Sequence, residues 1–169
     1  GVLNFDRPNY VLNVSQFKMI PGAAKAVARA NSAGYKVLVI TNQACIGKGL
    51  TTVEEVDEIH QEIQKACEAE GGKIEHFYFC PHTNEDKCGC RKPQPGMITQ
   101  AQQEWDFSPS STWMVGDATR DMEAAQAAGV RHALVLTGKG HLSHEAMPQL
   151  PYFEDLTAFV ACLLSPGCL

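Results

Sequence analysis

The sequence predicts a single α/β domain over residues 1–169, with a Rossmann-like parallel sheet and helices on both faces. Apolar runs of strand length alternate with amphipathic stretches of helix length, a pattern typical of βαβ units. The length suits one domain, and 44% hydrophobic residues can form a core without disulfides. Polar residues directly follow three of the predicted strands, and in parallel sheets that edge carries the chemistry.

The first half of the chain supplies two predicted helix–strand pairs. An Ala-rich helix begins after Pro21 and is stopped by Gly34, because glycine accepts the left-handed conformation at a helix end. The β-branched run that follows has the length of a buried parallel strand. Thr52 is the expected N-cap of the next helix, with Glu55 three residues later, as in a capping box.

The second half repeats the alternation with shorter elements. Gly116 ends one apolar run, and Gly129 stops a short Ala-rich helix. The predicted elements are helices over 22–31, 53–70, 95–105, 121–128 and 156–164, and strands over 36–41, 74–79, 112–116 and 132–136. Apart from that last helix, residues 140–169 show no readable motif and are expected to form a surface loop.

Composition excludes several classes of protein. Nineteen acidic against fourteen basic residues give a net charge of −5, which argues against binding to nucleic acid or to an anionic membrane surface. No apolar run approaches the roughly 20 residues that span a bilayer. The expected protein is a cytoplasmic monomer.

A cysteine–histidine cluster is the strongest local signal. Cys80 and His82 form a C-x-H pair, and Cys88 and Cys90 form a C-x-C pair five residues later. Three thiolates and one imidazole satisfy tetrahedral zinc and leave no open position, so the predicted site is structural and pins its loop. The alternative is a loop of reduced cysteines with a chance histidine. The remaining cysteines are scattered, which favours a reducing compartment: Cys45, Cys67, Cys162 and Cys168.

Candidate anion and cation ligands follow the predicted strands. Arg91 and Lys92 come directly after the last cluster residue, where a fixed lysine is a good counter-charge for phosphate; the alternative is a solvated basic pair. Asp117 follows a strand in a Gly-Asp turn and suits Mg²⁺, whereas Asp121 could simply cap the next helix. Thr41 offers a hydroxyl to an anion, although an ordinary strand-ending threonine is the alternative.

These motifs, taken in order, resemble the haloacid-dehalogenase phosphatases. The matching segments are Thr-Asn-Gln at 41–43, the Cys/His loop running into Arg-Lys-Pro-x-Pro-Gly-Met at 91–97, and Gly-Asp-x-x-x-Asp at 116–121. The resemblance extends from residue 1 to about residue 139. Within that family, the sequence most resembles the zinc-containing branch that includes the heptose 1,7-bisphosphate 7-phosphatases and the histidinol-phosphatases.

The resemblance implies a Mg²⁺-dependent phosphatase that works through an aspartyl-phosphate. It makes Thr41 and Lys92 the groups that stabilise the transferring phosphoryl, Asp117 the Mg²⁺ ligand, and Arg91 a recognition residue. The implied substrate is a small phosphorylated metabolite, with a sugar bisphosphate ahead of histidinol phosphate. The implied substrate contacts are Asp6, Arg7, Asn9, Tyr10, Thr41, Asn42, Gln43, Ala44, Arg91 and Lys92.

The sequence departs from the family pattern at the nucleophile. Of the family motif Asp-x-Asp-Gly-x-x-Asn, only Gly1-Val2-Leu3-Asn4 is present, so the nucleophile and the acid/base aspartate would precede Gly1. Asp6 lies five residues after the glycine and does not replace them. The expectation is an N-terminally truncated chain without the family's first strand, which binds zinc but does not hydrolyse phosphate by itself.

Two readings from other classes remain open. A catalytically dead domain could keep the fold and the zinc as a binding module, although the intact Thr41, Lys92 and Asp117 argue against it. A zinc module for nucleic acid is disfavoured by the acidic balance.

Overall fold

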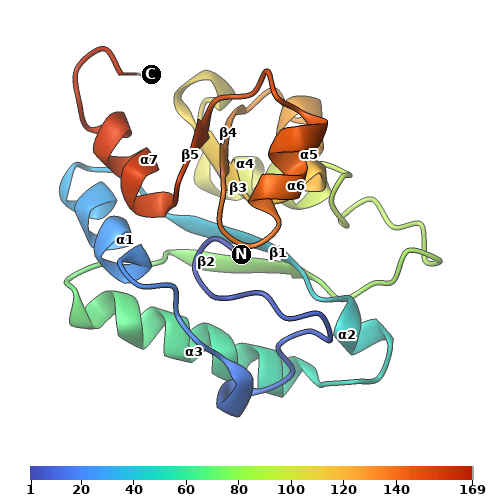
Figure 1. The fold of residues 1–169 in the computed structure, drawn as a ribbon. Coiled ribbons are helices and arrows are strands. Elements are labelled where there is room, and N and C mark those ends of the chain that lie inside the picture. The colour runs from blue at the N-terminus through green and yellow to red at the C-terminus, as the bar shows by residue number, and fades with distance from the viewer. Residues whose placement is uncertain (169) are drawn as a thin grey trace.

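The computed structural model describes residues 1–168, so Leu169 of the expected 1–169 domain lies outside the described part. Parallel strands alternate with helices (Figure 1), as the sequence predicts. In chain order the elements are η1 (Val14–Gln16), α1 (Ala23–Ser32), β1 (Leu38–Asn42), α2 (Ala44–Gly47), α3 (Val53–Ala69), β2 (His76–Cys80), α4 (Gly96–Trp105), η2 (Pro109–Ser111), β3 (Trp113–Gly116), α5 (Thr119–Ala127), β4 (Arg131–Val135), α6 (Gly140–Ala146), β5 (Tyr152–Phe153) and α7 (Leu156–Leu163).

The strands form two sheets rather than the expected single one. β1 pairs with β2 in parallel, with Leu38 opposite His76, and β3, β4 and β5 form a second parallel sheet. Within residues 1–168 no ladder joins β1 to β3. The physical reason is that no other strand lies between these two edges to connect them.

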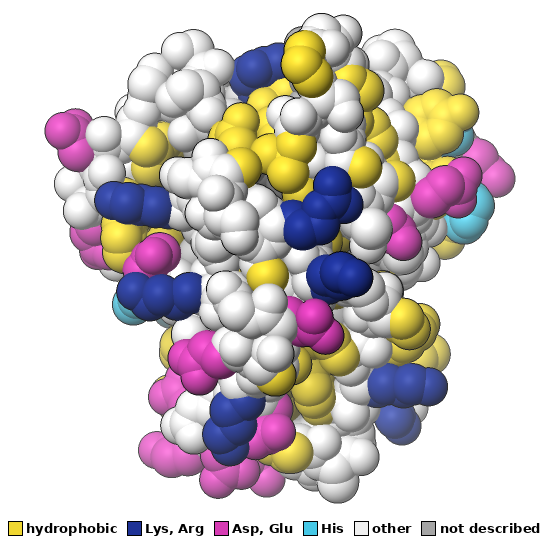
Figure 2. All heavy atoms as spheres, turned by 90° about the vertical axis from the view of Figure 1, so that its left-hand side faces the viewer, with side chains coloured by type: hydrophobic (Ala, Val, Ile, Leu, Met, Phe, Trp, Pro, Cys, Tyr) yellow, Lys and Arg dark blue, Asp and Glu magenta, His cyan; other side chains and the backbone are white. Residues whose placement is uncertain are grey.

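Helices cover both faces of the strands. α1, α3 and α7 contribute to one apolar cluster that includes Val27, Ile63 and Phe159. α4 and α5 pack on the opposite side, where Ile98 meets Ala124 and Ala125. Alternate residues of β1 join opposite clusters, as the two-residue repeat of a strand requires. Figure 2 shows one side of the molecule as two lobes, with acidic side chains concentrated on the lower one.

The N-cap of α3 is confirmed, but only half of the capping box forms. The Thr52 hydroxyl accepts a hydrogen bond from the Glu55 amide at 3.3 Å. The Thr51 hydroxyl instead lies 2.7 Å from a Glu55 carboxylate oxygen and 2.6 Å from the Leu12 carbonyl oxygen, and these two acceptors share its single proton. These bonds tie the N-terminal segment to the start of α3.

The expectation of a surface loop beyond residue 140 is wrong. This region forms α6 and the short strand β5 before the predicted α7. β5 is too short to show an alternating pattern, and it is held by tertiary contacts: the Leu134 amide donates to the Pro151 carbonyl and the Leu136 amide to the Phe153 carbonyl, each at 2.9 Å. Cys162 and Cys168 form a disulfide, which the expectation of reduced cysteines did not include. Among the described residues, no helix combines the length and the apolarity needed to cross a membrane.

A buried histidine on α3 gives stability a pH dependence. His60 is buried and stacks on Phe77 with ring centroids 4.5 Å apart. Burial lowers its pKa, and Asp57, whose carboxylate oxygen lies 3.7 Å from Nδ1, only partly opposes that shift. Because the folded state disfavours the proton, the contribution of His60 to stability is complete above its ordinary pKa of 6.5 and is lost as pH falls below it.

We therefore expect His60→Phe to flatten the pH dependence of unfolding. The wild-type free energy of unfolding should fall by up to about 1.4 kcal/mol per pH unit more than that of the variant as pH drops below about 6.5. Urea unfolding of both proteins across this range measures the difference. Parallel pH profiles would contradict the assignment.

Candidate active site

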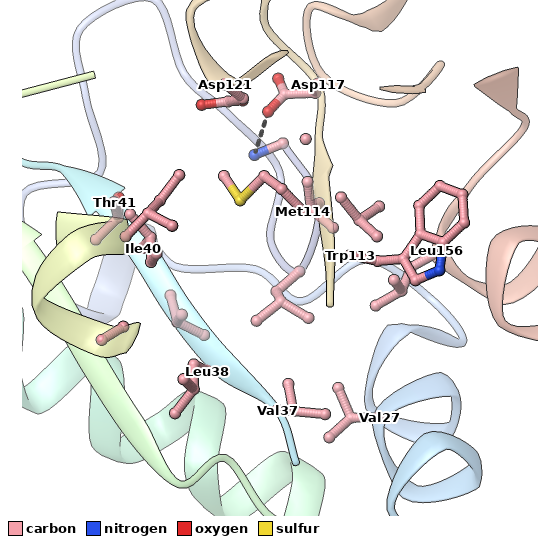
Figure 3. A pocket seen from close by; sticks show the side chains of 18 of the residues that line it. Val27, Val37, Leu38, Ile40, Thr41, Trp113, Met114, Asp117, Asp121 and Leu156 are labelled. Atoms are coloured by element: carbon pink, nitrogen blue, oxygen red, sulfur yellow. Dashed lines mark ion pairs between the residues drawn. The ribbon is translucent and has the colours of Figure 1, made fainter. Parts of the chain in front are cut away.

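Four polar side chains meet where the strands end. Thr41 lies at the end of β1, Asp117 follows β3, Asp121 lies in the first turn of α5, and Lys92 comes from the loop after the cysteine cluster. All four line one cavity of about 530 Å³ between the two sheets. Figure 3 shows Thr41, Asp117 and Asp121 at one end of this cavity, with apolar side chains below them. The sequence prediction that these strand ends share one edge is confirmed.

Lys92 is the central cation of this edge. It is only 8% exposed, its Nζ lies 2.7 Å from Asp121 Oδ1, and it donates to the Ile40 carbonyl at 2.8 Å. Burial opposes ionisation of Asp121, but Lys92, the Ala118 amide and Arg120 together hold the pKa of that carboxyl below its usual range. A buried lysine held this firmly presents a fixed positive charge to the cavity.

Asn42 fixes the backbone that carries Lys92. Its Nδ2 donates to the Lys92 carbonyl at 3.0 Å, and its Oδ1 accepts from the Lys92 amide at 3.1 Å. The side chain was expected in a phosphate cradle, and its amide is occupied by these two bonds. Gln43 lines the cavity and donates from Nε2 to the Thr41 hydroxyl at 3.4 Å.

Asp117 is held by the loop that follows β4. Its Oδ2 accepts from the Lys139 amide, and its backbone carbonyl accepts from the Ser143 hydroxyl, both at 2.9 Å. Its Oδ1 lies 3.8 Å from the Gly1 amino group (Figure 3). The preceding Gly116 has no room for a β-carbon, because the Asp121 side chain lies against it. Close packing against Asp121 therefore requires glycine at position 116, in addition to the turn that the Gly-Asp pair predicts.

The expected substrate contacts divide into two groups. Asp6 and Tyr10 line the cavity, whereas Arg7, Asn9, Ala44 and Arg91 are outside its lining. The Arg91 guanidinium instead donates to the Asn84 side chain at 2.7 Å and to the His82 carbonyl at 3.3 Å. These hydrogen bonds connect Arg91 to the loop between Cys80 and Cys90 and stabilise that loop.

Sequence reasoning missed two cations near this edge. Lys48 donates to the Tyr10 hydroxyl at 3.1 Å, and Lys139 Nζ lies 3.7 Å from an Asp6 carboxylate oxygen. Neither lysine belongs to a motif, and only the folding of distant segments places them here. Counting positive charges after each predicted strand would have flagged Lys139.

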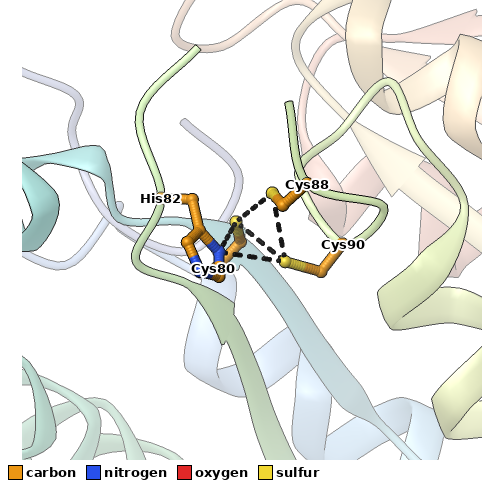
Figure 4. Close-up of side chains that lie close together, drawn as sticks. All are labelled: Cys80, His82, Cys88 and Cys90. Carbon is orange, nitrogen blue, oxygen red and sulfur yellow. Dashed lines mark hydrogen bonds between the residues drawn. The ribbon is translucent and has the colours of Figure 1, made fainter. Parts of the chain in front are cut away.

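The cysteine–histidine cluster has the geometry of a four-ligand metal site. One ligand atom from each of the four predicted residues lies within 4.8 Å of all the others, and Figure 4 shows them facing one another. Sulfur–sulfur distances are 3.1 to 3.6 Å, and His82 Nδ1 lies 3.3 Å from Cys90 Sγ and 3.5 Å from Cys80 Sγ. Tetrahedral zinc with bonds of about 2.3 Å separates its sulfurs by roughly 3.8 Å, so the residues fit this ion after a small expansion.

The other free cysteines are buried and unreactive. Burial raises the pKa of Cys45, and it raises the pKa of Cys67 to about 11, so both remain thiols at neutral pH. Cys45 Sγ donates to the side-chain oxygen Oε1 of Gln43 at 3.4 Å. Complete burial of Cys45 supports a small structural thiol rather than a redox-sensitive one.

The geometry defines a class of protein: an α/β protein with a fixed lysine and two aspartates at the carboxyl edge of parallel strands. Comparison with known proteins narrows this class. A family profile described as HAD-hydrolase-like matches residues 89–158. The D-glycero-beta-D-manno-heptose-1,7-bisphosphate 7-phosphatase of Neisseria meningitidis is 41% identical over 94% of this chain and 88% of its own length. The protein of that name from Pseudomonas aeruginosa is 35% identical over 97% and 93%.

Solved structures agree with the sequence relatives. A D,D-heptose 1,7-bisphosphate phosphatase from B. bronchiseptica, in complex with magnesium and phosphate, superposes with a TM-score of 0.92. It is 34% identical and covers 97% of this chain and 93% of its own. The chain therefore belongs to the haloacid-dehalogenase-like hydrolases, as the motifs predicted, and its phosphatase relatives within that family support a phosphoric monoester hydrolase.

Proposed function

We propose that this chain forms the phosphate-binding and metal-binding site of a Mg²⁺-dependent phosphatase that acts on a sugar bisphosphate, with heptose 1,7-bisphosphate as the first candidate. One observation carries the proposal. In a chain that is similar over nearly its whole length to proteins named for this reaction, Thr41, Lys92 and Asp117 line one cavity. Histidinol phosphate is the second candidate substrate.

Each of these residues has a defined part in the proposed site. Lys92 Nζ supplies positive charge to the transferring phosphoryl group, and the Thr41 hydroxyl donates a hydrogen bond to it. Asp117 offers carboxylate oxygens for Mg²⁺, which takes one or two protein carboxylates and completes its shell with water and phosphate. When bound, the ion neutralises phosphate charge. Asp121 positions the Lys92 ammonium group through an ion pair, and Asn42 positions the Lys92 backbone through hydrogen bonds.

The nucleophile and the acid/base group are assigned by the family resemblance. The matching Asp-x-Asp would directly precede the Gly-Val-Leu-Asn of residues 1–4. In this proposal, residues 1–169 stabilise and orient the phosphate, and that aspartate pair supplies covalent and proton-transfer chemistry.

Zinc has a structural part in the proposal. Its four ligands hold the loop whose end carries Arg91 and Lys92, and a four-ligand site leaves no position for a reacting water. Zinc binding needs Cys80, Cys88 and Cys90 reduced and in the thiolate form.

The test uses protein purified from its native source, with intact mass and N-terminal sequence determined on the same preparation. We expect Mg²⁺-dependent phosphate release, faster with heptose 1,7-bisphosphate than with histidinol phosphate. We also expect an Asp-x-Asp before Gly1 in that preparation. A native protein with no turnover on any phosphate ester would overturn the proposal and favour the zinc-containing binding module.

Replacing Asp117 should affect the metal-dependent step most directly. In active native-length protein, Asp117→Asn is expected to lower kcat/KM by roughly 100-fold, because a metal ion contributes several kcal/mol to phosphate charge stabilisation. The Mg²⁺ concentration for half-maximal rate should rise as well. Asp106→Asn is the matched control, since exposed Asp106 has a φ of 47° and asparagine accepts that conformation. Equal activity in the two variants would contradict the assignment of Asp117.

A further inference from the structure

Arg120 is a charged side chain of the cavity wall with no part in the site described so far. It is the second residue of α5, directly before Asp121, and it lines the same cavity as Thr41 and Asp117. The side chain is half-buried, and its Nε is fully buried without a hydrogen-bond partner among residues 1–168. The guanidinium also takes part in none of the ion pairs of this described part. An arginine with unused donors in a cavity is suited to bind an anion.

The neighbouring charges leave this end of the cavity short of positive charge. Lys92 Nζ lies 2.7 Å from Asp121 Oδ1, so these two charges largely cancel. Asp117 then adds a negative charge, which repels a phosphate dianion unless a cation offsets it. Lys36 also lines the cavity, but it precedes the amino end of β1, whereas Thr41 lies toward the carboxyl end. Among the described lining residues, Arg120 is therefore the cation available at the Asp117 end besides the paired Lys92.

The guanidinium is held near the Lys92–Asp121 pair. Its positive charge contributes to lowering the pKa of Asp121, an effect that requires the two groups to lie close together, and Figure 3 shows Asp121 beside Asp117 at this end. Burial of Nε indicates that the stem of the side chain is packed in place, which leaves the two Nη groups as the atoms that can reach a ligand. A charge fixed in this way loses little freedom on binding.

We propose that Arg120 is a phosphate-binding residue of this site, in addition to Thr41 and Lys92. In this assignment its Nη groups donate to oxygens of a phosphate bound beside Asp117. A planar guanidinium suits that ligand because it donates two parallel hydrogen bonds to one phosphate and keeps its charge at neutral pH. The inference deepens the proposed function and rests on it for the identity of the anion.

Titration of the 169-residue chain with inorganic phosphate tests the assignment, with Mg²⁺ present, ionic strength fixed and binding followed by phosphorus NMR. Arg120→Gln removes the charge and the paired donors, and it should raise the Kd for phosphate by about tenfold or more. Arg120→Lys keeps the charge but loses the paired donors, so we expect an increase of about three- to fivefold. Both replacements favour helix, so neither should disturb the first turn of α5.

Arg29→Gln is the matched control. Arg29 is exposed on α1 and lines a separate groove with Lys25 and Glu70, so the same loss of one charge should leave the Kd unchanged. Urea unfolding of all three variants checks that they remain folded. An unchanged Kd in Arg120→Gln would overturn the proposal. An equal increase in Arg29→Gln would overturn it as well, because it would indicate a general effect of net charge.

NMR of the arginine side chains observes the contact without relying on a loss of binding. The Nε–H signal of Arg120 is the one that disappears from the proton–nitrogen correlation spectrum of Arg120→Lys. In the wild-type chain this signal should shift on addition of phosphate and saturate with the same Kd, whereas chloride at equal ionic strength should not move it. A signal that phosphate leaves in place would overturn the proposal even if Arg120→Gln weakens binding, because the effect of that variant would then be indirect.

Turnover by the native-length protein is measured separately and decides the proposed function. There we expect Arg120→Gln to lower kcat/KM for heptose 1,7-bisphosphate by about tenfold or more, and Arg29→Gln to leave it unchanged. Phosphate binding that depends on Arg120 in a protein without turnover would retain the binding assignment and count against the proposed function. Equal turnover by wild type and Arg120→Gln would retain the proposed function and overturn the assignment of Arg120.

Discussion

Replacing Lys92 with methionine is expected to lower the free energy of unfolding by about 3–5 kcal/mol. The substitution leaves the Asp121 carboxylate without its ion-pair partner at a position only 4% exposed. It also removes the donor to the Ile40 carbonyl. Urea unfolding at neutral pH measures the loss.

Three comparisons make this prediction specific to the buried pair. Lys139→Met removes an exposed ion pair with Asp6 and should change stability by no more than about 1 kcal/mol. Adding Asp121→Asn to Lys92→Met should restore much of the loss, because asparagine carries no charge and can still accept from the Ala118 amide. The deficit should also shrink at acid pH, where Asp121 takes a proton. Equal losses in Lys92→Met and Lys139→Met would contradict the ion-pair explanation.

The wild-type pair has its own pH dependence. The pKa of folded Asp121 lies below that of an unfolded aspartate because the combined effect of Lys92, the Ala118 amide and Arg120 exceeds that of burial. Its contribution is therefore fully present above the unfolded pKa and is lost as pH falls through the folded one.

Removing one cluster ligand is the second large effect. Cys88→Ser should reduce bound zinc from one ion per chain to almost none. The loop would lose the metal that orders it, and we expect the free energy of unfolding to fall by about 3 kcal/mol or more, equivalent to roughly 6–12 °C in Tm for a chain of this length. Elemental analysis and thermal unfolding measure the two quantities on the same sample.

The matched control is a cysteine outside the cluster. Cys67 is fully buried on the core-facing side of α3, so Cys67→Ala should lose some stability but keep its zinc. A chelator should lower the Tm of wild type and Cys67→Ala and leave that of Cys88→Ser unchanged. Full zinc occupancy in Cys88→Ser would show that these four side chains do not form the metal site.

Local pattern was enough for most elements of the fold. The predicted strand over 112–116 corresponds to β3, and the predicted helix over 53–70 corresponds to α3 within one residue. Both have a clear apolar period, and α3 also has its Thr52 cap. β5 and α6 were missed because neither has an apolar periodicity that the sequence could reveal. Pairing with β4 holds β5 in place, and packing against β4 holds α6 in place.

The candidate site also contains features that the sequence predicts and features that it does not. The metal cluster was predictable because its ligand types and spacing lie within eleven residues, and the structure brings all four together. The pairing of Lys92 with Asp121 was not predictable, since these residues are far apart in sequence and only the meeting of two loops buries them together. Arg91 was expected at the substrate, but its guanidinium contacts Asn84 and the His82 carbonyl.

By itself, the sequence determined the α/β class, the strand ends that carry polar groups, the zinc-type ligand set and the family, because each depends on residue types at short spacing. Only the tertiary structure decided that, within residues 1–168, the strands form two sheets with no ladder between β1 and β3, and that Asn42 and Asp121 hold Lys92 at the cavity. These features depend on which distant backbone edges and side chains meet. Their energies come from hydrogen bonding and charge pairing in buried surroundings, which no local pattern specifies.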